Sequence, residues 1–352
     1  MSNRSAHNEM NPTNDLRIQR ARPLISPAVL EEEIPMPNTS TTMISEARRK
    51  IADIIHGRDE RLLMIVGPCS VHDPQAVKEY GARLKALSDE VNERLLLVLR
   101  VYFEKPRTTI GWKGYINDPR LDESFQVNEG LRGARRLLAE LAATELPCAS
   151  EFLDTTLGQY YADLVSWGAI GARTVESQIH RQLASGLSMP VGLKNRTDGD
   201  VQAAVDALVA ARRAHLFPSL TKEGAPALLE TLGNEDSHLV LRGGIQPNYE
   251  SQSIEAALGL LTKSRIDTGI VIDCSHGNSR KDYRAQVSVA RDVIAQRHSG
   301  TRKIVGIMLE SHLVAGRQDA PATYGQSITD ACLGWDETER LIREIARQHK
   351  AT

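Results

Sequence analysis

The stretch LLMIVGPCS, residues 62–70, decides the fold of this chain. Five consecutive apolar residues end in the turn-forming pair Gly67 and Pro68, and Cys69 follows directly. A short apolar run bounded by turn residues is typical of a strand that is buried on both faces of a parallel sheet. We therefore predict a buried parallel strand that starts at Leu62 and places Cys69 at its carboxyl end.

The same arrangement occurs seven more times. Each further run of mainly apolar residues ends in or just before a polar residue, namely Arg100, Glu151, Arg173, Lys194, Arg242, His276 and Glu310. Amphipathic stretches of helical length alternate with the runs, at 73–92, 125–143, 156–167, 176–186, 199–213, 252–264, 280–298 and 335–348. Eight such units predict an α/β fold, a closed (β/α)8 TIM barrel, in which active sites lie at the carboxyl ends of the strands. All eight polar residues are thus expected around one barrel mouth.

The N-terminal residues 1–45 are expected to form an arm and not a domain. They are rich in Asn, Ser, Thr and Pro, and the prolines block regular structure over much of the stretch. The segment LISPAVLEEEIP, residues 24–35, carries enough apolar residues to pack on a neighbouring subunit, so a disordered arm and a docked arm are both open. We predict a short helix over 45–55 and a single catalytic barrel domain over 46–352.

Two further strand candidates, AHLFPSL at 214–220 and ALLETLG at 227–233, exceed the eight places of a barrel. Pro218 is poorly suited to a central strand because proline cannot donate a ladder hydrogen bond. We therefore predict an N-terminal extension and an inserted β-hairpin near 214–233 as additions to the barrel.

Composition excludes several classes of protein. A net charge of -2 with only scattered basic clusters argues against nucleic-acid binding. No apolar stretch approaches the roughly 20 residues that cross a bilayer, and no signal peptide is recognisable, so we expect no membrane partner and a cytoplasmic location. The four cysteines are far apart and form no C-x-x-C pair, which predicts reduced thiols. The absence of a P-loop or G-x-G-x-x-G motif disfavours nucleotide-dependent chemistry.

Cys69, His276, Glu310 and Asp330 form a candidate metal-binding set. A thiolate, an imidazole and two carboxylates suit a borderline divalent ion such as Mn, Fe, Co or Zn. The spacing is entirely non-local, so the alternative is a buried apolar cysteine and a histidine in ordinary structural hydrogen bonds.

Six cations gather at strand ends and in the loop EKPRTT, namely Arg100, Lys105, Arg107, Arg173, Lys194 and Arg242. Guanidinium groups bind phosphate and carboxylate oxygens in a bidentate manner, so a phosphorylated acid is the expected substrate. Lys194 could form an imine as in a Schiff-base aldolase, transfer a proton, or neutralise phosphate. Glu151 could transfer a proton or hold an arginine in place.

Several long strings together closely resemble the microbial type I 3-deoxy-D-arabino-heptulosonate 7-phosphate (DAHP) synthases, from about Asp15 to the C-terminus. The strings are GPCSVHDP, LRVYFEKPRTTIGWKGYINDP, SEFLD, WGAIGARTVESQIHRQLASGLS, PVGLKN, LRGG, IDCSHGNS, ESHL and SITDACLGW. The resemblance implies condensation of phosphoenolpyruvate with D-erythrose 4-phosphate, the feedback-regulated first step of the shikimate pathway, with a divalent metal as cofactor.

The resemblance also implies a role for each matching residue. The implied metal ligands are Cys69, His276, Glu310 and Asp330, of which Cys69 and His276 would also act in catalysis with Lys194. The implied phosphoenolpyruvate-binding residues are Arg100, Glu151, Gly171, Ala172, Arg173, Lys194 and Arg242. The implied erythrose 4-phosphate-binding residues are Lys105, Pro106, Arg107, Thr108 and Asp330. Carbon 3 of phosphoenolpyruvate would attack the aldehyde, water would add to carbon 2, and phosphate would leave, with Lys194 as the proton donor.

In such enzymes the arm and the hairpin build subunit contacts, in a homodimer or homotetramer, and a site for an aromatic amino acid inhibitor. The matching effector residues here are Asp154, Leu183, Leu187, Ser188 and Ser219. The chain departs from the pattern at Arg196, where KNGTDG becomes KNRTDG, and around Pro218 in LFPSLTKEG. The second departure adjoins the expected effector pocket and leaves the identity of the inhibitor open.

Three competing functions follow from the same residues. A catalytically weakened regulatory paralogue would keep the fold without turnover, and a Schiff-base aldolase would use Lys194 and ignore chelators. A related synthase that makes an eight-carbon sugar acid from arabinose 5-phosphate shares the barrel but lacks the agreement over KPRTTIGWKG and SITDACLGW.

Overall fold

The computed structural model describes residues 13–349, and eight of its strands close into a parallel barrel. These strands are β1 (Leu62–Gly67), β2 (Leu95–Arg100), β3 (Cys148–Glu151), β4 (Trp167–Ile170), β5 (Val191–Lys194), β8 (His238–Leu241), β9 (Ile270–Asp273) and β10 (Ile304–Glu310). Their order around the barrel is β1-β10-β9-β8-β5-β4-β3-β2. The predicted (β/α)8 TIM barrel is confirmed.

The strands form because nearly every residue in them is apolar and buried. In β1 all six residues are buried, and the strand pairs in parallel with β10 on one side and β2 on the other. Side chains that alternate along a strand point to opposite faces. Leu63 and Ile65 therefore belong to the cluster inside the barrel, whereas Leu62, Met64 and Val66 pack outwards against the helices.

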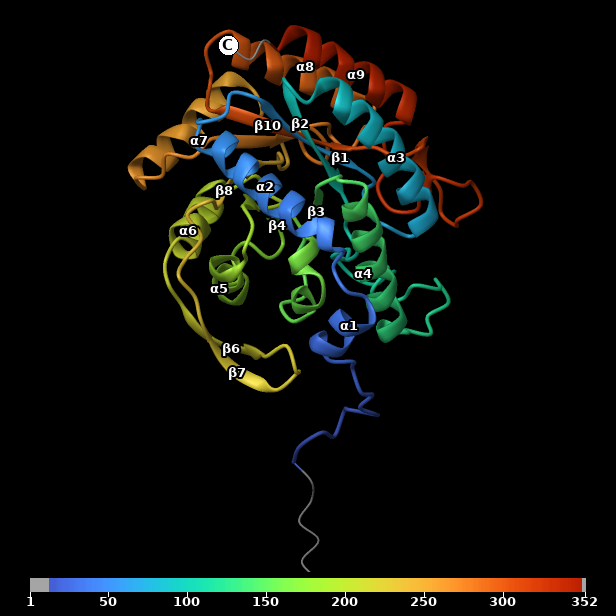
Figure 1. Ribbon diagram of the computed structural model, residues 1–352. Helices are drawn as coiled ribbons and strands as arrows, with labels where there is room; N and C mark the ends of the chain where they lie inside the picture. Colours follow the sequence, from blue (N-terminus) through green and yellow to red (C-terminus); the bar gives the residue numbers. More distant parts are fainter. Residues whose placement is uncertain (1–12, 350–352) are drawn as a thin grey trace, which may run out of the picture.

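Helices surround the barrel (Figure 1), and most lie where the amphipathic stretches predict them. They are α3 (Pro74–Val91), α4 (Val127–Ala143), α5 (Gln178–Gly186), α6 (Gln202–Ala211), α7 (Ser251–Lys263), α8 (Ala285–His298) and α9 (Trp335–Gln348). Asp73 starts α3 as an N-cap, because its carboxylate accepts hydrogen bonds from the N–H groups of Gln75 and Ala76. The helix expected from residue 280 begins only at Ala285.

The helix predicted over 156–167 is wrong. The structure has two short 3-10 helices there, Leu157–Tyr160 and Ala162–Leu164, and β4 already begins at Trp167. Tyr161 has an extended φ of -148° that separates the two turns. Its ring stacks on Phe152 with 5.8 Å between the ring centroids, so packing of an aromatic pair overrides the helical pattern.

The arm is more regular than its prolines predict. Helix α1 (Pro27–Glu33) has proline in its first turn, where a missing N–H costs nothing, and Ser26 as its N-cap. Helix α2 (Asn38–Ile55) starts before the expected residue 45. Residues 1–12 of the arm lie outside the described residues.

Helix α2 closes the amino end of the barrel (Figure 1). Ile51, Ile54 and Ile55 are fully buried and belong to the cluster of inward-facing side chains from the strands. The carboxyl end, where the polar residues gather, is therefore the open end.

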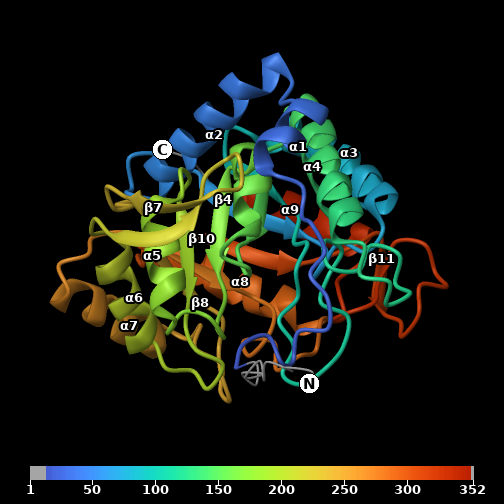
Figure 2. The same ribbon diagram turned by 90° about the horizontal axis from the view of Figure 1, so that it is seen from below.

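The inserted hairpin is present, with β6 (Leu216–Leu220) and β7 (Pro226–Glu230) paired in antiparallel register. It stands apart from the barrel strands and close to α1 (Figure 2). A second small sheet, β11 (Val314–Arg317) with β12 (Gln326–Ser327), has no counterpart in the sequence prediction. None of the helices described over 13–349 is long and apolar enough to cross a membrane.

Candidate active site

The eight polar residues expected at strand ends all lie there. Arg100, Glu151, Lys194 and Glu310 are the last residues of their strands, and Cys69, Arg173, Arg242 and His276 follow within three residues of theirs. Because the eight strands are parallel, their carboxyl ends meet at one opening, which we call the barrel mouth.

Three of the four candidate metal ligands converge at this mouth. The ligand atoms of Cys69, Glu310 and Asp330 all lie within 4.8 Å of one another. His276 lies beside them, with its Nε2 atom 3.6 Å from Glu310 Oε1. A thiol, an imidazole and two carboxylates form a donor set that suits a borderline divalent ion, so the residues fit the metal that the sequence predicts.

Burial and neighbouring charges shift the pKa values of two of these ligand groups. Burial raises the pKa of the Cys69 thiol to about 11, and the Glu310 carboxylate adds to this shift. Burial alone would raise the pKa of Asp330, but the Lys105 ammonium holds that pKa well below its ordinary value. Metal ligation requires the thiolate, so a bound ion would have to overcome this cost of ionising Cys69.

Two cations already compensate part of the negative charge. Lys105 Nζ lies 2.9 Å from Cys69 Sγ and 2.7 Å from Asp330 Oδ2. Arg100 is almost completely buried and donates to Glu310 Oε1 at 3.0 Å and to the carbonyl oxygens of Pro68 and Cys69. Its guanidinium also lies over the Tyr102 ring, 3.6 Å from the centroid. Arg100 therefore holds Glu310 and the β1 end in place.

Lys194 takes part in a second buried network, which includes a residue that the sequence analysis missed. Lys194 Nζ lies 3.0 Å from Asp273 Oδ2, and His276 Nδ1 lies 3.0 Å from the same oxygen. Although burial opposes it, His276 and Lys194 hold the pKa of Asp273 well below its ordinary value. The Lys194 amine is thus engaged by a buried carboxylate. The position of Asp273 at the end of the IVID strand was the available signal.

Glu151 packs against the turn after β4. A Cβ atom added to Gly171 would lie 2.2 Å from Glu151 Oε1, so a larger residue there would displace the Glu151 carboxylate. Ala172 is half-buried and Arg173 is exposed at the same turn. The turn at residues 171–173 therefore places its backbone and the Arg173 guanidinium at the mouth, next to the buried Glu151 carboxylate.

The loop after β2 carries the residues expected at the second substrate. Lys105 and Pro106 are half-buried, whereas Arg107 and Thr108 are exposed. Arg107 Nε donates to the Trp112 carbonyl at 2.8 Å, and Thr108 Oγ1 accepts from Arg173 at 3.5 Å. This loop therefore adjoins both the candidate metal cluster, through Lys105, and the β4 turn, through Thr108.

A cavity of about 450 Å³ opens at the rim beside these groups, and we call it the rim cavity. Its lining includes Arg173, Thr197, Arg242, Gln246, Arg280 and Lys281. Arg173 and Arg242 were predicted, but Arg280 and Lys281 were missed, although both follow His276 in the string HGNSRK. The unusual Arg196 does not line the cavity, since it pairs with Glu176 at 2.9 Å and Asp198 at 2.8 Å.

A larger cavity of about 930 Å³ lies between the arm and the hairpin, and we call it the arm–hairpin cavity. Among the expected effector residues, Leu183, Leu187 and Ser188 line it. Asp154 and Ser219 do not, although Thr155, next to Asp154, and Phe217, two residues before Ser219, do. Asp154 instead caps the 3-10 turn by accepting from the N–H groups of Thr156 and Leu157. Arg48, Gln159 and Lys222 are polar lining residues that sequence reasoning did not single out.

Fold and site together define a class of protein, a (β/α)8 barrel enzyme whose mouth combines a set of possible metal ligands with cations suited to phosphate. Residues 34–343 match the model of the DAHP synthetase I family. The chain belongs to this family.

The chain is similar to several relatives over nearly its whole length. The chain is 50% identical over 342 residues to the Phe-sensitive phospho-2-dehydro-3-deoxyheptonate aldolase of Escherichia coli K12, covering 96% of this chain and 98% of that relative. It is 49% identical over 341 residues to the Trp-sensitive form from the same strain, again covering 96% and 98%. The solved structure of the corresponding aldolase from Francisella tularensis SCHU S4 superimposes with a TM-score of 0.92 at 50% identity, covering 94% of this chain and 98% of that one.

Proposed function

We propose that this protein condenses phosphoenolpyruvate with D-erythrose 4-phosphate and water to give DAHP and phosphate, the first step of the shikimate pathway. The observation that carries the proposal is the convergence of Cys69, Glu310 and Asp330 within 4.8 Å at a mouth faced by cations. Family membership and relatives of about 50% identity support the same reaction.

Different groups of residues at the mouth would bind the metal ion and phosphoenolpyruvate. Cys69, His276, Glu310 and Asp330 would hold one divalent ion, which supplies Lewis acidity towards the aldehyde oxygen when bound. Arg173 and Arg242 are placed to bind the phosphate and carboxylate of phosphoenolpyruvate, with Gly171 and Ala172 beside them.

Lys194 is our candidate proton donor. Its Nζ lies 3.0 Å from Asp273 Oδ2 in a buried pair inside the mouth. Erythrose 4-phosphate would be positioned near the Lys194 amine by the loop residues Lys105, Pro106, Arg107 and Thr108. Holding both substrates in one orientation supplies much of the rate.

Purified protein supplied with Mn²⁺ and both substrates should release phosphate and form DAHP, with no release when either substrate is omitted or EDTA is added. Lys194→Gln should lower kcat by about a hundredfold or more. Lys303→Gln, which removes an exposed lysine paired with Asp267, is the matched control and should keep wild-type turnover.

Each competing function gives a different result. A folded protein that binds phosphoenolpyruvate without turning it over would indicate a regulatory paralogue. Inactivation by borohydride in the presence of substrate, with indifference to EDTA, would indicate a Schiff-base aldolase.

The arm–hairpin cavity is our proposed site for the aromatic amino acid inhibitor. Leu183, Leu187 and Phe217 give it apolar walls suited to an aromatic ring, and Lys222 and Arg48 can meet a carboxylate. Activity titrated with phenylalanine, tyrosine and tryptophan identifies the inhibitor. Leu187→Ala should weaken its inhibition, whereas Leu216→Ala, on the exposed face of the hairpin, should not.

The resemblance also supports a homodimer or homotetramer in the cytoplasm. Sedimentation velocity distinguishes the two assemblies from each other and from a monomer.

A further inference from the structure

The lining of the rim cavity is rich in cationic side chains. Arg173, Arg242, Arg280 and Lys281 line it, and its described lining contains neither aspartate nor glutamate. Burial lowers the pKa of Arg242; the Asp273 carboxylate opposes this shift, and the neighbouring Arg173 adds to it. Several cations around a cavity whose lining holds no carboxylate indicate an anionic ligand.

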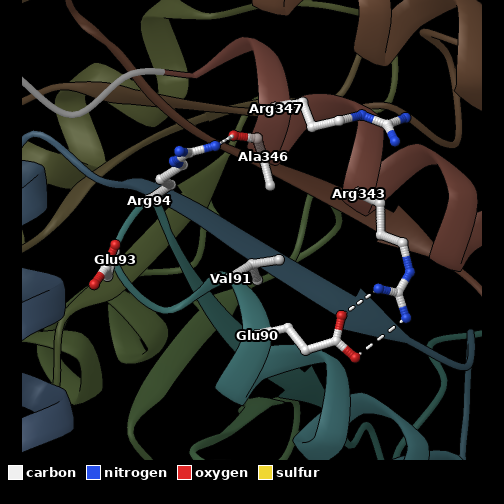
Figure 3. Close-up of a pocket in the computed structure, with 7 residues that line it drawn as sticks. All are labelled: Glu90, Val91, Glu93, Arg94, Arg343, Ala346 and Arg347. Atoms are coloured by element: carbon white, nitrogen blue, oxygen red, sulfur yellow. Dashed lines mark hydrogen bonds and ion pairs between the residues drawn. The ribbon is translucent and has the colours of Figure 1, made fainter.

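Arginines in another cavity of the molecule behave differently. At the amino side of the barrel, Arg343 pairs with Glu90, and Arg94 donates to the Ala346 carbonyl at 3.0 Å (Figure 3). Those guanidinium groups serve the packing of α3 against α9. The rim cations have no such partner in the lining of their own cavity, so local packing does not explain them.

The backbone that presents Arg280 and Lys281 is unusual. Both residues have left-handed conformations, with φ of 50° and 64°, and His276 on the same turn has a φ of 55°. Left-handed backbone is uncommon for residues with a Cβ, and such strain persists where the surroundings enforce it, often at ligand sites. Arg280 and Lys281 therefore occupy two positions of this turn at which glycine would be less strained.

The loops beneath the cavity are locked together by glycines. A Cβ on Gly244 would lie 2.3 Å from Gly199 Cα, and one on Gly277 would lie 2.5 Å from Gly244 N. The loops after β5, β8 and β9 therefore touch backbone to backbone, which fixes the spacing of the cations above them. Such a rigid base is what a preorganised binding site requires.

Arg280 and Lys281 lie at the outer part of this cavity, whose inner lining includes the candidate metal ligand His276. Arg100, Glu151 and Lys194 are buried, whereas Arg280 and Lys281 are exposed at the rim. Because α2 fills the amino end with Ile51, Ile54 and Ile55, an anion released inside leaves through the mouth, past these cations.

We propose that Arg280 and Lys281, at the outer edge of the rim cavity beside the phosphoenolpyruvate-binding Arg173 and Arg242, form an outer phosphate subsite that receives the inorganic phosphate released by the reaction. The inference rests on the proposed function, because that reaction produces one phosphate for each turnover. Two or more guanidinium and ammonium groups around a phosphate dianion give charge-assisted hydrogen bonds that water alone cannot replace.

The test is a calorimetric titration of inorganic phosphate into Mn²⁺-loaded protein saturated with phosphoenolpyruvate. The wild type should bind a phosphate at the rim besides any that the loop of Lys105 and Arg107 holds, and the double variant Arg280→Gln with Lys281→Gln should bind the rim phosphate about tenfold more weakly or worse. Arg284→Gln is the matched control, because Arg284 lies on the same segment but stacks on Tyr283 and does not line the cavity. The charge-conserving variant Arg280→Lys with Lys281→Arg should retain most of the affinity.

Lack of phosphate binding by the saturated wild type, or equal affinity in the double variant, would overturn the subsite. Product inhibition gives a second measure, since the inhibition constant for phosphate should rise by the same factor in the double variant. Because the titration needs no turnover, a protein that binds phosphate but forms no DAHP refutes the proposed reaction and not the subsite.

Discussion

Glu104 is a buried carboxyl group between the substrate loop and the loop that carries Asp154. Burial raises its pKa to about 7, and the Asp154 and Glu151 carboxylates add to the shift. Its carboxylate accepts a hydrogen bond from the Asp154 N–H at 3.3 Å. A carboxyl group with a raised pKa stabilises the fold while it is protonated, and that contribution is lost as the pH rises from the unfolded pKa to the folded one.

Glu104→Gln should therefore be more stable than the wild type above pH 7, by about 3 kcal/mol, because the unfolded wild type gains more from ionisation than the folded form. The difference should shrink as the pH falls and vanish near the unfolded pKa. Urea unfolding of both proteins across this pH range measures it. A constant difference at every pH would contradict a titrating Glu104.

At the residue scale, the sequence predicts which side chains reach the mouth better than it predicts their partners. Cys69, Glu310 and Lys194 are placed by the ends of their own strands, so local pattern is enough. The pairing of Lys194 with Asp273, and the position of Lys105 between Cys69 and Asp330, depend on contacts between distant segments. No spacing rule in one sequence contains those contacts.

Among the elements, the hairpin and α1 depend on each other. Lys222 Nζ, in the turn of the hairpin, lies 2.6 Å from Glu31 Oε1 of α1 and 2.6 Å from the Gln159 carbonyl. The Lys222 carbonyl accepts from the Ala28 N–H at 2.7 Å. One lysine thus joins three segments around the arm–hairpin cavity.

Lys222→Ala should loosen α1 without unfolding the barrel. The free energy of local opening should fall by about 1 kcal/mol, and the amides of α1 should exchange with solvent correspondingly faster. Hydrogen exchange read by mass spectrometry measures this, with Lys263→Ala, at the end of α7, as the control. Unchanged exchange in α1 would show that apolar packing alone holds the arm.

Strands of the barrel were predictable as elements because burial on both faces leaves an uninterrupted apolar run. The connection after β3 was not, since a helical pattern there yields to the stacking of Tyr161 on Phe152. Helix α1 was masked by its prolines, although Pro27 occupies a position where proline is tolerated. The two-residue strand Gln326–Ser327 is too short for any periodicity to reveal.

For the whole molecule, a bound ion should act as a stabilising ligand. Binding to the folded state alone adds about 2.7 kcal/mol at an ion concentration a hundredfold above Kd. The Tm should therefore rise with added Mn²⁺ and fall after EDTA treatment. Calorimetry at several ion concentrations measures the effect.

Asp330→Asn should lose most of this dependence, because the variant removes one of the clustered carboxylates. Asp336→Asn, in the first turn of α9, is the control for a general effect of charge. If the Tm of the wild type does not change with Mn²⁺ concentration or EDTA, the proposed metal site at the mouth is contradicted.

The hairpin shares no ladder hydrogen bond with the eight barrel strands, since β6 pairs only with β7 in the described sheets. The barrel scaffold that carries the candidate metal ligands therefore does not depend on β6 and β7 for strand pairing. If the arm–hairpin cavity holds the inhibitor as proposed, exchanging β6 and β7 should change the response to that inhibitor while the barrel strands keep their arrangement.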